Sequence, residues 1–121
     1  MIQNNKMIER FNSGIIEICV KKNKRIKRNL FDGNIRYKDE TLGVTRFYEA
    51  RVADSKITKV ISIPYQHVLN NDDRDKYAVY LDGQWYDVDL VQIKSETFIP
   101  KVFLTLKKGG IAYVDERQRN Q

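Results

Sequence analysis

The chain has 121 residues, 41% of them hydrophobic and 31% charged, which is enough for one compact domain and too short for two ordinary ones. Cys19 is the only cysteine and His67 the only histidine, which excludes disulfide frameworks, zinc fingers and metal sites with several histidines. No stretch approaches the roughly 20 apolar residues of a membrane span or forms a secretory leader, so we expect a protein of a reducing compartment with no membrane partner.

The first half of the chain contains one clear strand. Residues 1–13 are polar, and the run of β-branched residues within 14–20 predicts a strand. Residues 21–28 interrupt it, and Asp32-Gly33-Asn34 has the composition of a turn. In residues 35–55 the apolar positions fit a helix and an alternating strand about equally well, and we interpret them as a strand.

The second half gives stronger signals. Residues 57–63 are rich in β-branched side chains and end at Pro64, which marks the end or edge of a strand because proline cannot donate to a sheet. Residues 70–73 form a polar connection. Two alternating runs then flank Asp82-Gly83, a pair that favours a two-residue type I′ hairpin turn.

That turn predicts a register that places Tyr80 opposite Trp85 and one apolar face toward the core. After Leu90 the alternation changes phase, which indicates a bulge or a bend. A last strand starts after Pro100, and residues 111–114 add a short one. We therefore predict an all-β fold: a single-domain barrel over residues 1–121, of about five to seven mostly antiparallel strands, with a long loop between early strands and disordered tails at 1–13 and 115–121.

The net charge of +6 comes from one short segment of the chain. Residues 21–28, here called the basic octet, carry six cations and no acid, and removing these six from the 22 basic residues leaves 16 basic and 16 acidic residues. The octet can neutralise phosphates or contact a connector protein, or it can be a solvated hairpin tip whose lysines discourage aggregation. Its cations are Lys21, Lys22, Lys24, Arg25, Lys27 and Arg28.

Tyr80 and Trp85 form the second candidate surface. The predicted register directs both rings away from the core, where they act either as a cross-strand brace or as the anchor of an interface. Asp87 and Asp89 flank this pair and suit a basic partner surface. The basic octet of a neighbouring subunit is one hypothesis for that partner.

Sequence signals for an enzyme are weak. Cys19 and His67 are a conceivable nucleophile and base, but no motif links them, and the chain has no Gly-x-Ser-x-Gly elbow or glycine-rich phosphate loop. Asp87 and Asp89 are better interpreted as outward polar positions of a strand than as a catalytic pair. An acidic stretch resembles a calcium loop, but Lys76 occupies the position that needs glycine. We expect no catalytic residue, no metal and no cofactor. The stretch contains Asn71, Asp73, Asp75 and Asp82.

Four segments in a fixed order carry a family resemblance. Residues 46–50, 60–65, 82–88 and 102–106 read RFYEA, VISIPY, DGQWYDV and VFLTL. Together with the polar N-terminus, this order resembles the small head-tail adaptor, or head-completion, proteins of long-tailed bacteriophages. The resemblance covers about residues 40 to 108, and the basic octet departs from it.

The resemblance implies a structural protein rather than an enzyme. Such proteins are small β-barrels that form a homo-oligomeric ring between the portal-side connector and the tail, and the ring helps to retain packaged DNA. Its partners would be the connector ring, tail proteins and, non-specifically, DNA. The protein would reside in the virion, and in the host cytoplasm during assembly. Residues 36–56 are then the natural long loop, and Arg46, Phe47 and Tyr48 join Tyr80, Trp85, Asp87 and Asp89 as expected interface residues.

A nucleic-acid-binding barrel that uses the basic octet is the alternative function. In that case, neutralising the six cations should abolish binding. In the adaptor case, the same change should affect only assembly.

Overall fold

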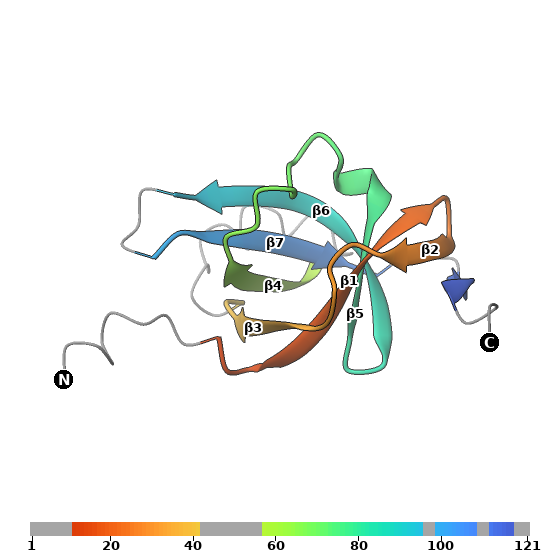
Figure 1. The fold of residues 1–121 in the computed structure, drawn as a ribbon. Coiled ribbons are helices and arrows are strands. Elements are labelled where there is room, and N and C mark those ends of the chain that lie inside the picture. Colours follow the sequence, from red (N-terminus) through yellow and green to blue (C-terminus); the bar gives the residue numbers. More distant parts are fainter. Residues whose placement is uncertain (1–10, 42–56, 96–98, 109–111, 118–121) are drawn as a thin grey trace.

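The computed structural model describes residues 11–41, 57–95, 99–108 and 112–117, and its regular structure there is almost entirely β (Figure 1). The described strands are β1 (Gly14–Lys22), β2 (Arg25–Asn29), β3 (Ile35–Asp39), β4 (Ile57–Pro64), β5 (Tyr77–Leu81), β6 (Gln84–Lys94), β7 (Lys101–Lys107) and β8 (Val114–Asp115). Between β4 and β5 the chain also forms a 3-10 turn, η2 (Arg74–Lys76).

Six of these strands close into an antiparallel barrel, in the order β3-β4-β7-β6-β5-β1. The barrel closes where the start of β1 pairs with β3, with Gly14 opposite Tyr37 and Ile16 opposite Ile35. The predicted small all-β barrel is therefore confirmed. Strands β2 and β8 extend the sheet beyond the barrel, and the β1–β2 hairpin projects from one side of it (Figure 1).

The barrel core follows from the alternation of apolar residues along each strand. From β7, for example, Val102, Leu104 and Leu106 point inward and are fully buried. The connection between β4 and β5 adds Leu69, which is 1% exposed. The other large core side chains are Ile16, Ile18, Tyr37, Ile61, Ile63, Tyr77, Val79, Leu81, Tyr86, Val88 and Val91.

The β5–β6 hairpin has the predicted register. Val79 pairs with Tyr86, and Tyr80 pairs with Trp85. Asp82 and Gly83 have φ angles of 52° and 76°, as a type I′ turn requires at both central positions. The predicted phase change is also present, because the pairing of β6 with β7 shifts between Val88 and Leu90.

The basic octet and residues 35–39 both contribute to strands. The basic octet does not simply interrupt a strand, since it forms the end of β1, a turn and most of β2. Residues 35–39 form β3, whose Tyr37 is buried in the core, so the strand interpretation of 35–55 is right at its start, and the long loop that the resemblance implies does not begin at residue 36. Residues 42–56 of that predicted loop lie outside the described part of the chain.

Candidate functional site

The basic octet forms the tip of the β1–β2 hairpin. Lys22 pairs with Arg25, and the two-residue turn between them contains Asn23 with a φ angle of 58°. A bulge follows, because Val20 pairs with Arg28 while Lys21 pairs with Ile26. The hairpin tip expected as one interpretation of the octet is therefore present.

Most of these cations have carboxylate partners within the same chain. The Lys24 Nζ atom lies 2.9 Å from Asp87 Oδ2, and Lys21 Nζ lies 3.7 Å from Asp87 Oδ1. Glu116 lies between two further cations of the octet. Its carboxylate accepts hydrogen bonds from Arg25 at 2.6 Å and from Lys27 at 2.7 Å. In the described part of the chain, Lys22 and Arg28 have no ion-pair partner. Among the described residues, these two are the octet cations that are exposed and lack an ion pair, so the octet is a weaker phosphate-binding surface than its sequence indicates.

Trp85 and Tyr80 pack against each other on the outside of the barrel, with ring centroids 4.7 Å apart and ring planes tilted by 51°. Trp85 is half-buried and packs with Tyr113, at a centroid distance of 5.7 Å, over a second small apolar cluster. Burial against the chain's own residues favours the brace interpretation of Trp85 over the interface anchor. The buried members of this cluster are Cys19, Ile26 and Ala78.

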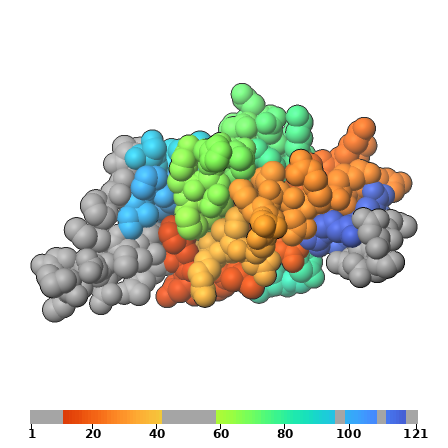
Figure 2. Space-filling model, viewed as in Figure 1, coloured from red at the N-terminus to blue at the C-terminus, as the bar shows by residue number. Residues whose placement is uncertain are grey.

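Residues 112–117 form a strap that holds this cluster closed, and Figure 2 shows them against the β1–β2 hairpin. Two backbone bonds fix the strap to β2: Val114 N donates to Lys24 O, and Glu116 N donates to Ile26 O. Strand β8 thus runs parallel to β2, with Asp115 beside Ile26. Residues 115–117 were expected to start a disordered tail, yet they make some of the closest polar contacts in the described chain.

Arg117 is the centre of the strap. Its guanidinium donates to Glu17 Oε1 at 2.6 Å, to Asp115 Oδ2 at 2.7 Å and to Asn29 Oδ1 at 2.8 Å. It also lies over the Trp85 ring, 5.4 Å from its centroid. The hydrogen bonds to Asp115 and Glu17 raise the pKa of Arg117, so this cation is permanently charged. Sequence reasoning missed Arg117, because the only local signal was a short charged run, Asp115-Glu116-Arg117, in a polar tail.

The acids near Trp85 have partners in the same chain as well. Asp87 binds the two octet lysines described above, and Asp89, the extra residue at the β6 bulge, lies 3.4 Å from Lys107 Nζ. Neither carboxylate therefore needs the octet of a neighbouring subunit as a partner, as the sequence-based hypothesis had suggested. Asp87 is paired with octet lysines of its own chain.

Cys19 is fully buried under this strap, and His67 is exposed in the connection after β4. Burial raises the pKa of the Cys19 thiol to about 11, although nearby Arg117 opposes the rise. A thiol with this pKa is almost wholly protonated at neutral pH and is a poor nucleophile. The structure therefore gives no chemical support to a Cys19–His67 pair.

The acidic stretch that resembles a calcium loop in sequence lies mainly in the connection that leads into β5, where its side chains bind other residues of the chain. Asn71 Oδ1 accepts the backbone N–H of Val91 at 2.9 Å. Asp73 accepts from Asn70 Nδ2 at 3.0 Å and lies 3.3 Å from Lys76. Among the residues that the structure describes, no group of three or more histidine, cysteine or acidic side chains is arranged to hold a metal ion.

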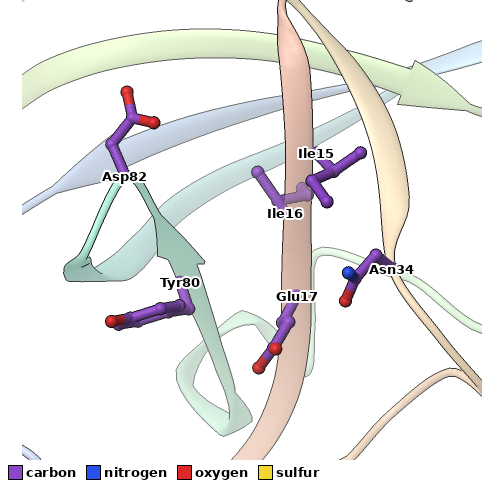
Figure 3. A pocket seen from close by; sticks show the side chains of 6 residues that line it. All are labelled: Ile15, Ile16, Glu17, Asn34, Tyr80 and Asp82. Atoms are coloured by element: carbon purple, nitrogen blue, oxygen red, sulfur yellow. The ribbon is translucent and has the colours of Figure 1, made fainter.

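A shallow groove of about 270 Å³ crosses the outside of β1 beside the aromatic pair (Figure 3). Strand β1 runs through the middle of it, with the β5 hairpin on one side and Asn34 on the other. Sequence reasoning did not predict this groove, because it forms where three segments distant in sequence meet. Its lining residues are Ile15, Ile16, Glu17, Asn34, Tyr80 and Asp82.

The remaining expected interface residues, Arg46, Phe47 and Tyr48, lie outside the described residues. Within the described ranges, no helix has the length and apolar character needed to cross a lipid bilayer. Comparisons with protein-family models, with curated proteins and with solved structures find no match to this chain.

Proposed function

We propose that this protein is a structural ring component of a long-tailed bacteriophage, a head-tail adaptor that joins the portal side of the head to the tail and helps to retain packaged DNA. Its partners are then further copies of itself, the connector ring and tail proteins. This proposal rests on the resemblance in four segments and on the barrel in which three of them lie.

The observation that carries the proposal is the position of those three segments. Residues 60–65 lie in and just after β4, residues 82–88 begin at the β5–β6 turn and continue into β6, and residues 102–106 lie in β7. These strands are neighbours in the order β4-β7-β6. Segments dispersed along the sequence thus form one continuous wall of the barrel. That arrangement is consistent with a shared barrel fold.

The ion pairs of the basic octet favour this proposal over the nucleic-acid-binding barrel. Binding of phosphates by Lys/Arg releases counterions in proportion to the number of cations engaged. Here Asp87 and Glu116 already engage four of the six cations. A surface built for phosphate would keep those cations available, whereas these cations hold the hairpin to β6 through Asp87 and to the strap through Glu116.

The test is deletion of the gene from the phage or prophage that encodes it, followed by electron microscopy of the lysate. The proposal predicts finished heads and finished tails that fail to join, and joining restored when the gene is supplied from a plasmid. Intact, infectious virions after deletion would contradict it.

A further inference from the structure

The groove across β1 has the size of a site for one side chain. Its volume is about 270 Å³, just below the range of about 300–1,000 Å³ that is typical of small-molecule pockets. It is open to solvent along the outside of the barrel, between the β5–β6 turn and the segment that leads into β3 (Figure 3). A protruding side chain from another protein surface can enter it directly.

The walls suit a long side chain with a cationic end. Ile15 and Tyr80 are 53% and 36% exposed, and they offer apolar surface to an aliphatic stem. Around them lie the Glu17 and Asp82 carboxylates and the Asn34 amide, which all provide oxygen acceptors. An apolar wall next to carboxylates is the environment that lysine and arginine prefer at protein surfaces.

The adjoining surface already holds such a group in the same chain. Arg117 donates to Glu17 and covers Trp85, and Trp85 in turn packs against Tyr80. Asp82, at the other end of the groove, has no ion-pair partner among the described residues. The Arg117 guanidinium thus covers the part of this surface near Glu17 and Trp85. The part near Ile15, Tyr80 and Asp82 forms the open groove.

The basic hairpin carries the complementary charges. Lys22 and Arg28 are exposed and, within the described part of the chain, are the octet cations that lack an ion pair. Lys22 is seven residues along β1 from Ile15, a separation of roughly 23 Å at 3.3 Å per residue. The Lys22 side chain cannot bridge that distance, so Lys22 of one copy cannot fill the Ile15 end of its own groove.

We propose that the groove at Ile15, Tyr80 and Asp82 receives Lys22 or Arg28 from the basic hairpin of a second copy of this chain. The two surfaces are different, so the contact is head-to-tail, the kind of contact that builds a ring when its rotation closes. This inference deepens the proposed function, since it names the contact between neighbouring subunits of the ring.

The experiment measures self-association of the full chain by sedimentation equilibrium. Asp82→Asn removes the charge while asparagine still accepts a positive φ at the turn. It should weaken association about fivefold, the upper range for a single exposed ion pair. Asp82→Lys and the double variant Lys22→Glu with Arg28→Glu should each abolish association by opposing like charges. Asp72→Lys, an equal charge change on an exposed residue before η2, is the matched control and should associate as the wild type does.

Mixing the two reversed variants gives the decisive arm. Each keeps one intact surface, so the intact hairpin of the Asp82→Lys chain can enter the intact groove of the other, and the reversed hairpin meets an opposite charge at residue 82. The mixture should therefore regain the association that each variant loses alone. A wild-type chain that stays monomeric at millimolar concentration, equal loss in the Asp72→Lys control, or a mixture that stays monomeric would overturn the inference.

These outcomes are separate from those of the gene deletion. Failure to join heads and tails, combined with no groove contact, would leave the adaptor role and remove only this inference. Charge-dependent self-association through the groove, combined with normal virions after deletion, would support the contact and contradict the adaptor role.

Discussion

Replacing Arg117 with alanine tests whether the C-terminal strap contributes to the stability of the fold. The variant loses three charge-assisted contacts, to Glu17, Asp115 and Asn29, and also the guanidinium that covers Trp85. No atom of the barrel core is removed. Any loss of stability therefore measures the strap and the β1–β2 hairpin rather than the barrel.

The expected magnitude follows from the exposure of these groups. Charge-assisted hydrogen bonds contribute about 1.5–3 kcal/mol when buried, whereas exposed ion pairs contribute about 0.2–1 kcal/mol. Arg117 is 16% exposed, but Glu17 and Asp115 are 30% and 28% exposed and regain water once the arginine is gone. We therefore expect a loss of about 2 kcal/mol in the free energy of unfolding, or a decrease in Tm of about 8 °C for a domain of this size.

Urea unfolding measures this loss, with Trp85 as the probe because it is the only tryptophan. Far-UV circular dichroism of the same samples reports the barrel. Arg117→Lys keeps the charge but not the planar fork and should lose roughly half as much. Arg28→Ala, at an exposed arginine of β2, is the control and should change stability by less than about 0.5 kcal/mol. An Arg117→Ala variant as stable as this control would refute the reasoning.

Three further predictions concern the same region. The Cys19 thiol should resist a disulfide exchange reagent at pH 8, because burial raises its pKa to about 11, and a chain that ends at residue 111 should react much faster. Hydrogen bonds from Arg117 lower the pKa of Asp115, and hydrogen bonds from two octet cations lower the pKa of Glu116. Their stabilisation is therefore complete above the unfolded values of about 4 and is lost as pH falls through the lower folded values, so Trp85 fluorescence should change in acid before the circular dichroism does. Glu116→Gln frees two octet cations. If the protein binds DNA, the plot of log binding constant against log salt concentration should become steeper by about two. An unchanged slope would show that these cations never face DNA.

The β5–β6 hairpin could be predicted residue by residue because its information is local. Asp82-Gly83 fixes the turn, the turn fixes the register, and the register places Tyr80 opposite Trp85 on the outer face. The change of phase near Leu90 likewise marked the bulge at Asp89. Neighbouring residues alone determine these features.

Strand β2 could not be predicted in this way, and β8 (Val114–Asp115) was predicted only in part, since the short strand expected at 111–114 overlaps it at Val114. The β2 sequence is mostly basic and has only one buried side chain, Ile26, so its apolar pattern is nearly absent. β2 is held by its pairing with β1 and by the strap, whose Glu116 and Arg117 are about 90 residues away in sequence. Such contacts leave no local periodicity, and they were found only when the fold brought the segments together.

The same contacts change the meaning of the basic octet. Its sequence suggests a surface of six free cations, but two acids, Asp87 and Glu116, each bind a pair of them. What remains for a partner is a narrower basic edge made by Lys22 and Arg28. A narrow edge suits a defined protein contact better than the broad, salt-sensitive binding of a polyanion.

The most direct test of the proposed function is a pull-down of the tagged full chain from a lysate of infected cells, at moderate and at high salt, with the captured molecules identified by mass spectrometry. The adaptor account predicts that connector and tail proteins are captured and remain bound at high salt. Capture of nucleic acid alone, lost as the salt concentration rises, would contradict it and would assign the working surface to the basic octet.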